Sequence, residues 1–127
     1  TQNFSAAHNP GANRPGAFAA DRAVLQDATW YYWTWAASHA FLAVGLQRFQ
    51  TRDGPVVWPE AFAHELLGRQ RPDGSWVNRF TDAKEDDPLV ATSWATAALA
   101  IGRAMTRGQS DMPDDRCPVG SPKSTPR

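Results

Sequence analysis

Apolar side chains along this chain follow three helical patterns, separated by polar segments that contain proline and glycine. Residues 27–49 start at Asp27, whose carboxylate suits a helix N-terminus, and are apolar almost all round the helical wheel. Residues 57–70 carry one apolar stripe and one polar face, with Pro59 in the first turn. Residues 88–104 are again apolar on most sides. The pattern predicts an all-α fold with two enclosed helices and a half-exposed helix between them, and no strand pattern competes with it.

The same pattern divides the chain into three regions. Residues 1–16 contain two Pro-Gly turn combinations and few apolar residues, which predicts a loop-rich lead-in. Residues 17–106 carry the helical patterns. Residues 107–127 hold four prolines and two glycines, and their few apolar residues do not offset the entropy of ordering them. This last region is predicted to be a disordered tail.

Composition and charge narrow the classes of function. The 127 residues allow one ordinary domain, and 13 basic residues against 13 acidic ones leave no basic field to hold nucleic acid. The single cysteine, Cys117, cannot form an internal disulfide or a Cys-based zinc site. Residues 28–47 are uncharged and long enough to cross a bilayer, but the polar residues among them favour a buried helix. The six tryptophans point to helix packing or to an apolar ligand.

Gln70 and Trp76 flank a Pro-Asp-Gly loop between the second and third predicted helices. A glutamine at a helix end can bond freed carbonyl groups or the next turn, Pro-Asp-Gly reverses the chain, and Trp76 can fold back as an apolar lid. The segment resembles the QW motif of the terpene cyclase and protein prenyltransferase superfamily. The resemblance continues through residues 86–92. It also includes the aromatic block at residues 30–33, which looks like that of bacterial proteins with prenyltransferase and squalene oxidase repeats; about residues 4–104 are covered.

The resemblance implies an α/α toroid, in which inner helices line a central apolar cavity and outer helices wrap them. Residues 27–49 and 88–104 would be inner helices, and residues 57–70 would be an outer one. A full ring has more hairpins than this sequence supplies, so the resemblance implies a C-terminal fragment, with the rest of the toroid N-terminal to Thr1. A repeat unit cannot bury its inner face alone, so we expect exposed apolar surface. The implied partner is an apolar small molecule or lipid, and contact with a membrane surface is compatible with it.

Asp86 and Asp87 are the candidate catalytic residues. Hopene and squalene cyclases use an Asp-x-Asp-Asp box whose middle carboxyl group protonates an alkene, and the resemblance places Asp86 at that donor position. Lys84 stands where the first acid is expected, and its charge would oppose the raised pKa that a proton donor needs. A competing interpretation is that both aspartates cap the helix that starts at Pro88. The sequence favours capping and leaves catalysis undecided.

No metal and no cofactor are predicted. Protein prenyltransferases bind zinc through an Asp-x-Cys pair and a later histidine. The resemblance matches Asp27 and Thr29 to that pair, with threonine in place of the thiolate. No histidine occurs in residues 86–105, so the implied ligand set is incomplete.

The candidate ligand-binding residues are the aromatic side chains Trp30, Tyr31, Trp33 and Trp94. Together with Trp35 they would line the cavity of a toroid, where their π faces can stabilise a carbocation. Ordinary helix packing explains the same residues and is the favoured interpretation. Two classes of function stay open. One is a cyclase-like enzyme or carrier for a polyisoprenoid-type ligand, and the other is a non-catalytic α/α scaffold whose rim binds a protein or a cell-envelope component.

Overall fold

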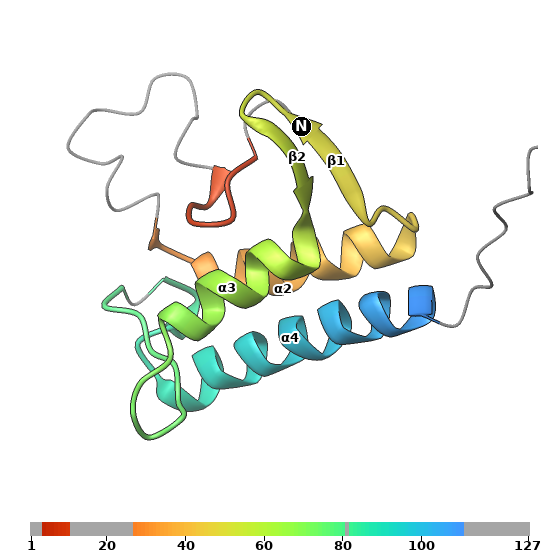
Figure 1. Cartoon of the computed structure of the whole chain (residues 1–127). Coiled ribbons are helices and arrows are strands. Elements are labelled where there is room, and N and C mark those ends of the chain that lie inside the picture. The colour runs from red at the N-terminus through yellow and green to blue at the C-terminus, as the bar shows by residue number, and fades with distance from the viewer. Residues whose placement is uncertain (1–3, 11–26, 81, 111–127) are drawn as a thin grey trace, which may run out of the picture.

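The computed structural model describes residues 4–10, 27–80 and 82–110, and this part of the protein is mostly helical. Its elements in chain order are α2 (Trp30–Ala43), β1 (Arg48–Thr51), β2 (Gly54–Val57), α3 (Trp58–Gly68), the short 3-10 helix η2 (Asp82–Lys84) and α4 (Pro88–Ser110). Figure 1 shows that α2 and α4 run in the same direction and that α3 runs in the opposite one. The three helices expected from the hydrophobic pattern are therefore present, with different bounds.

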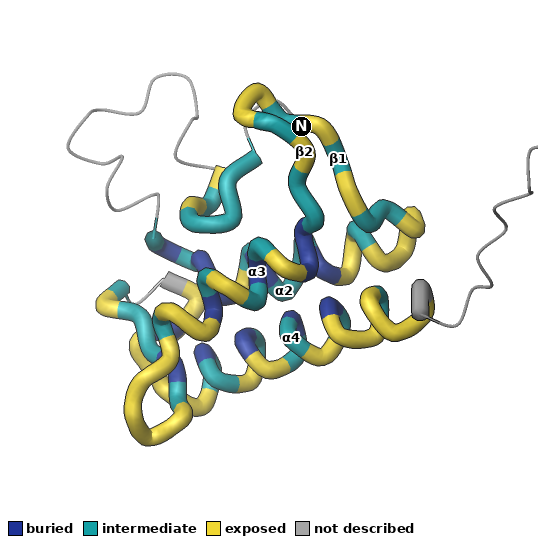
Figure 2. Tube along the Cα trace, in the orientation of Figure 1, coloured by how far each residue is buried: buried dark blue, intermediate teal, exposed yellow. Residues whose placement is uncertain are grey.

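Helix α4 packs against both α2 and α3 and carries one side of the core. Its buried positions are small, because Ala91, Ala95 and Ala98 are almost fully enclosed. They recur every three or four residues, so they form one stripe along the helix, and their short side chains let large neighbours approach. The large side chains of this core cluster are Trp30, Tyr31, Leu66 and Trp76. In Figure 2 the buried side of α4 is turned toward α2 and α3, and its exposed side is turned away.

Helix α2 is shorter than the predicted helix over 27–49 at both ends. It begins at Trp30 after the left-handed Thr29, so Asp27 is not its N-cap, and it ends before Gly45. Gly45 has φ 63°, in the left-handed region that glycine enters without steric cost. The Leu46 N–H donates to the Phe41 carbonyl at 2.9 Å, and the Gly45 N–H donates to the Leu42 carbonyl at 3.0 Å. These two bonds make a Schellman motif, which satisfies the last carbonyl groups of the helix and turns the chain away.

The segment after α2 forms a β-hairpin, which corrects the all-α prediction. Strands β1 and β2 pair antiparallel, with Phe49 opposite Val56 and Thr51 opposite Gly54. Aromatic and β-branched residues favour strands, and Thr51 Oγ1 donates to the Gly54 carbonyl at 2.8 Å across the turn. Each strand has only four residues, which is too short for alternation to stand out against the helical pattern before it.

Helix α4 is longer than the predicted helix over 88–104 and continues to Ser110. The sequence pattern assigns residues 107–127 to a disordered tail, but residues 107–110 are helical. A polar last turn needs no burial when it extends an existing helix, since each added residue gains a backbone bond without a new nucleus. Arg107 lies in this turn, where its positive charge complements the helix dipole.

Residues 4–9 form a turn without a helix or strand and lie against the helices, and Pro10 is in 3-10 conformation. The Trp30 indole Nε1–H donates to the Ala6 carbonyl at 3.1 Å. Three longer parts of the chain lie outside the described residues. They are the rest of the predicted lead-in (residues 1–3 and 11–16), the following residues 17–26, and the predicted tail beyond residue 110. Residues near the N-terminus therefore pack against the helices that follow them in the chain.

The loop after α3 folds back onto the end of that helix, as the sequence predicts. Gln70 Nε2 donates to the Gly74 carbonyl at 2.9 Å, and Gly74 turns the chain at φ 83°. The Trp76 indole is almost fully buried, and its Nε1–H donates to the Leu66 carbonyl at 2.7 Å. The Trp76 backbone N–H donates to Thr92 Oγ1 at 3.0 Å. One tryptophan thus fastens the loop to both α3 and α4.

Replacing Trp76 with phenylalanine should lower the free energy of unfolding by about 1–3 kcal/mol, because the buried bond to Leu66 and part of the buried ring are lost. Urea denaturation followed by circular dichroism measures the change. Trp35→Phe is the matched control, because the half-buried Trp35 indole has no hydrogen bond within the described residues. The control should change the free energy of unfolding by less than about 0.5 kcal/mol. Equal losses in both variants would contradict the role of Trp76 in fastening the loop to α3 and α4.

Candidate functional site

Helix α2 is capped by a residue 53 positions further along the chain. Thr29, which precedes the helix, is in the left-handed region at φ 57°, and its side chain makes no capping bond. Instead, Glu85 Oε1 accepts the Tyr32 backbone N–H at 2.7 Å. The first N–H groups of a helix have no partner inside it and attract negative charge. The fully buried Glu85 carboxylate therefore satisfies the start of α2 from a separate loop.

Asn78 completes this cap from the loop that follows α3. Its Nδ2 donates to Glu85 Oε2 at 2.9 Å and to the Asp27 carbonyl at 2.6 Å. Its backbone N–H donates to the Glu85 carbonyl at 2.8 Å. A buried carboxylate is costly unless its oxygens accept hydrogen bonds, and here both do. The start of α2 and the loops on either side of η2 are thus joined in one network.

The backbone around this cap is strained. Ala83 and Lys84, directly before Glu85, have φ 54° and 56°, and Thr29 also has a positive φ. They are the non-glycine residues with positive φ in the described part of the chain. Each such residue costs about 1–2 kcal/mol and persists only where its surroundings over-determine it. The strain is therefore concentrated where Glu85 is aimed at the end of α2.

Burial raises the pKa of the Glu85 carboxyl group above its usual value of 4.5, because a charged carboxylate is poorly solvated there. The hydrogen bonds from the Tyr32 backbone and the Asn78 side chain act in the opposite direction and only partly offset the burial. Since Glu85 is fully enclosed, it cannot touch a substrate. We therefore assign it the role of positioning α2.

Arg69, the C-cap residue of α3, joins three parts of the molecule. Its guanidinium lies 3.9 Å from the centre of the Trp30 ring, in cation–π geometry. It forms ion pairs with Asp27 Oδ1 at 3.6 Å and with Glu65 Oε2 at 3.8 Å. Its Nη2 also donates to the Ala7 carbonyl at 2.7 Å. Arg69 thereby holds the start of α2 and the N-terminal segment against the end of α3.

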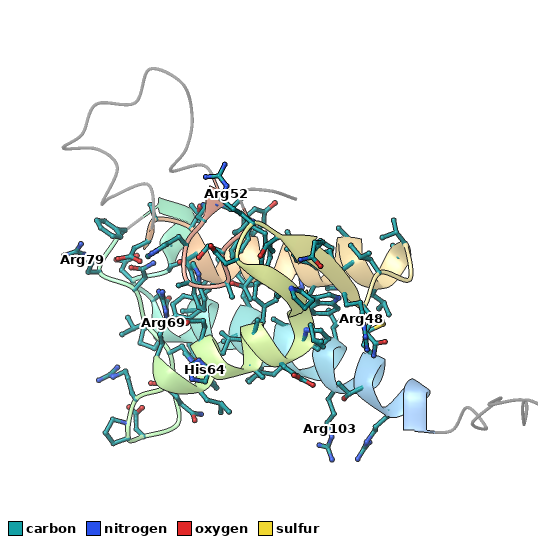
Figure 3. The ribbon with its side chains drawn as sticks, turned by 45° about the horizontal axis from the view of Figure 1, so that its top comes forward. Arg48, Arg52, His64, Arg69, Arg79 and Arg103 are labelled. Atoms are coloured by element: carbon teal, nitrogen blue, oxygen red, sulfur yellow. The ribbon has the colours of Figure 1, made fainter. Side chains whose placement is uncertain are left out.

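A polar pocket of about 280 Å³ opens beside this cap, and its lining residues are Asp27, Tyr31, Arg69, Val77, Asn78 and Arg79. Figure 3 shows Arg69 and Arg79 at the same end of the molecule. Burial raises the pKa of Tyr31 to about 12, and the positive charge of Arg69 lowers it in part. Near neutral pH the Tyr31 hydroxyl therefore stays protonated and is no general base. The charged and amide side chains of the lining suit the pocket to hold a polar group.

Asp87 is the N-cap of α4, which is the role that the capping interpretation gives it. Its Oδ1 accepts the Leu89 backbone N–H at 2.9 Å, and its carbonyl accepts the N–H groups of Val90 and Ala91. Asp86 is exposed beside it. Neither carboxylate lines one of the two pockets described here. Helix capping thus explains the position of Asp87, and Asp86 lies on the surface.

The predicted ligand-binding aromatics are placed in different environments. Trp30 and Tyr31 are buried, at 0% and 3% exposure, in the core between α2 and α4. The Trp33 ring is partly buried and packs edge-on against Phe62 of α3, with ring centres 5.3 Å apart. Trp94 is also partly buried, on the side of α4 next to α2. Trp30, Tyr31 and Trp33 are therefore engaged in helix packing.

An aromatic stripe on α2 and α4 remains partly open to solvent, and its members are Tyr32, Trp35, His39 and Trp94. The ring centres of Tyr32 lie 5.3 Å from Trp94 and 5.7 Å from Trp35, and the Trp35 and His39 rings are 4.9 Å apart. Tyr32 is 45% exposed. Of these residues, the sequence pattern singles out Trp35 and Trp94. It does not select Tyr32 as a ligand-binding residue, although Tyr32 belongs to the aromatic block at residues 30–33 and stands about one helical turn before Trp35.

A second, apolar groove of about 550 Å³ lies between α3 and α4. Leu66 and Ala98 are buried beneath it, and Glu60 and Arg103 stand exposed at its edges. None of the predicted ligand-binding aromatics lines this groove. It therefore offers an apolar surface separate from the aromatic stripe.

Within residues 4–10, 27–80 and 82–110, no group of three or more His, Cys, Asp or Glu residues is arranged to hold a metal ion. No helix in this part of the chain is long and apolar enough to span a bilayer. Comparison of the chain with models of known families, with curated proteins and with solved structures finds no match. The site is therefore interpreted from its geometry alone.

Asp87→Ala should destabilise the protein by about 1 kcal/mol, because the Leu89 N–H at the start of α4 loses its side-chain acceptor. Asp86→Ala is the matched control, since it removes a neighbouring exposed carboxylate, and it should change the free energy of unfolding by less than about 0.5 kcal/mol. Thermal denaturation of both variants, followed by circular dichroism, makes the comparison. A larger loss from Asp86→Ala than from Asp87→Ala would contradict the capping assignment.

Glu85→Gln should change how stability depends on pH. Because the pKa of Glu85 is raised in the folded protein, its protonated form is favoured there. Its contribution is therefore fully present below the usual pKa of 4.5 and decreases as the pH rises through the folded value. The free energy of unfolding of the wild type minus that of Glu85→Gln should thus fall as the pH rises above the usual pKa of 4.5. Urea denaturation of both proteins at a series of pH values above 4.5 measures this difference. A difference that does not change with pH would refute the raised pKa of Glu85.

Proposed function

We propose that this chain is a helical segment of an α/α-toroid type and that the aromatic stripe on α2 and α4 binds an apolar, polyisoprenoid-type molecule. The stripe is the single observation that carries the proposal. It joins aromatic rings from two helices on a surface that the described part of the chain leaves partly open. Exposed aromatic surface of this kind is typical of binding sites, since isolated domains rarely leave it uncovered without function.

The arrangement of the helices supports the toroid assignment. Helices α2 and α4 run in parallel, and α3 runs antiparallel to them, as inner and outer helices of such a ring do (Figure 1). Successive helical residues point about 100° apart, so Trp33 and Trp35 lie on different sides of α2. Trp33 contacts Phe62 of α3, whereas Trp35 is in the aromatic stripe. The side of α2 that carries the stripe is therefore the one that would face the hollow of a ring.

The chemistry of the stripe favours an uncharged hydrocarbon. Residues 30–43 contain no Asp, Glu, Lys or Arg, so α2 offers neither an ion pair to a charged headgroup nor a repelling charge. Apolar contact and the π faces of the rings are what remain for binding. Asp87 is committed to capping α4 and Glu85 is enclosed, so neither of these carboxyl groups is placed to protonate a ligand on the stripe. We therefore propose binding without catalysis in the described residues.

The alternative function, a scaffold for another protein, is favoured by the apolar groove between α3 and α4. Its apolar floor and the charged residues Glu60 and Arg103 at its edges resemble the composition of a protein interface, in which an apolar centre is surrounded by a polar rim. The groove lies on the other flank of α4 from Trp94. Loss of binding through the stripe and through the groove can therefore be measured separately.

Equilibrium dialysis of the full chain against radiolabelled farnesol tests the ligand proposal. Trp35→Ala should weaken farnesol binding at least about tenfold, which corresponds to about 1.4 kcal/mol. Leu89→Ala is the control, because Leu89 is a large apolar residue of α4 at 79% exposure and lies about 140° round the helix from Trp94. It should leave farnesol binding unchanged. The ligand proposal would be refuted if the wild type did not bind farnesol, or if the wild type, Trp35→Ala and Leu89→Ala bound it equally.

A further inference from the structure

Phe4 occupies an aromatic pocket built by three separate elements. The pocket, named here the Phe4 pocket, consists of Trp33 and Phe41 from α2, Phe49 from β1 and Phe62 from α3. The Phe4 ring meets Phe49 edge-on with centres 4.6 Å apart, and it lies 5.7 to 6.2 Å from the other three. Aromatic pairs at these separations attract each other beyond simple burial. The pocket thus fits one aromatic side chain.

The segment behind Phe4 is held through its main chain. The Trp30 indole donates to the Ala6 carbonyl at 3.1 Å, and Arg69 Nη2 donates to the Ala7 carbonyl at 2.7 Å. Further on, Asn9 Nδ2 donates to the Ala28 carbonyl at 3.1 Å. Carbonyl groups exist at every position of a peptide, so the Trp30 and Arg69 donors recognise the backbone of the segment, whereas Asn9 contributes a side-chain contact of its own. Specificity in this segment comes chiefly from Phe4.

We propose that the Phe4 pocket, together with the donors of Trp30 and Arg69, is a recognition site for a short peptide that turns after its aromatic residue, and that residues 4–10 occupy it in cis. The partner that fits is a peptide segment with an aromatic residue followed by free main-chain carbonyls two and three positions later. Anchoring of one side chain in a pocket, combined with main-chain hydrogen bonds, is a recurring mode of peptide recognition. This proposal does not rest on the ligand proposal for the aromatic stripe, which involves other residues of α2.

The receptor side is organised without the bound segment. Arg69 is held by its ion pairs to Asp27 and Glu65 and by its stacking on Trp30. The pocket residues Phe41 and Phe62 also contact each other and the buried Trp58. A preorganised site loses little conformational freedom on binding, which favours the binding of a second peptide when the cis segment leaves.

The occupying segment is separable from the core. Residues 4–9 belong to no helix or strand, Phe4 is only partly buried, and the core cluster around α4 does not include it. Residues 11–26 connect the segment to the start of α2. Because the segment and its pocket belong to the same chain, a separate peptide must compete with an intramolecular contact. A peptide added at micromolar concentration would then bind well only when the contact in cis is weakened.

The experiment uses the full chain and a dye-labelled synthetic peptide with the sequence of residues 1–10, followed by fluorescence anisotropy. We expect the full chain with Phe4→Ala to bind the peptide at least about tenfold more tightly than the wild type does, because its own occupant is impaired. A peptide that carries Phe4→Ala should not bind. A peptide with His8→Ala is the matched control, since His8 is exposed, and it should bind like the parent peptide.

Full-length Asn9→Ala provides a second variant, because it weakens the segment without removing apolar surface, and it should bind the peptide with an affinity between those of the wild type and Phe4→Ala. Equal peptide affinity of the wild type and both chain variants would overturn the proposal. Binding of the Phe4→Ala peptide as tightly as the parent would do the same. Loss of cooperative unfolding in the Phe4→Ala chain would also overturn it, since Phe4 would then be a core residue and not an exchangeable occupant.

Discussion

The contact between the Glu85 carboxylate and the first turn of α2 is the interaction on which the rest of the structure depends. Helix α2 has no local cap, because Thr29 lies in the left-handed region and its side chain makes no capping bond. The missing acceptor comes from a loop far along the chain, and Asn78 holds that loop in place. Positive φ values at Ala83 and Lys84 show that backbone strain is tolerated to bring the carboxylate there. A single buried carboxyl group therefore sets where α2 begins and links it to the loop that leads into α4.

Fixing the start of α2 also fixes which of its aromatic residues are enclosed. The helix is apolar on nearly every side, so apolar periodicity alone leaves its rotation about its own axis undetermined. With the cap in place, Trp30 and Tyr31 enter the core, Trp33 turns to α3, and Tyr32 and Trp35 remain at the surface. The same helix thus serves three environments. An aromatic-rich sequence is needed for all three, which explains why one short segment concentrates so many rings.

The sequence was sufficient where the structural cause is local. The cap by Asp87 and the fold-back of Trp76 each depend on a few neighbouring residues, and both could be predicted. The end of α2 at Gly45 is also local, but a long uncharged apolar run obscured it. The β-hairpin was missed because its strands have only four residues each, too few for alternation to be distinguished from the helical pattern before them. The role of Glu85 could not be predicted, since nothing in its neighbourhood identifies the first turn of a distant helix as its partner.

Arg69 shows how the two proposed binding surfaces stay independent. It is committed to Asp27, Glu65 and the face of Trp30, and all of these contacts lie at the end of α2 that Glu85 caps. The N-terminal segment adds only a carbonyl acceptor to this arrangement. Exchange of that carbonyl for water or for another peptide leaves the ion pairs and the stacking in place. The aromatic stripe shares no residue with this set, so occupation of one surface need not move the other, and the rigid helix α2 between them carries both.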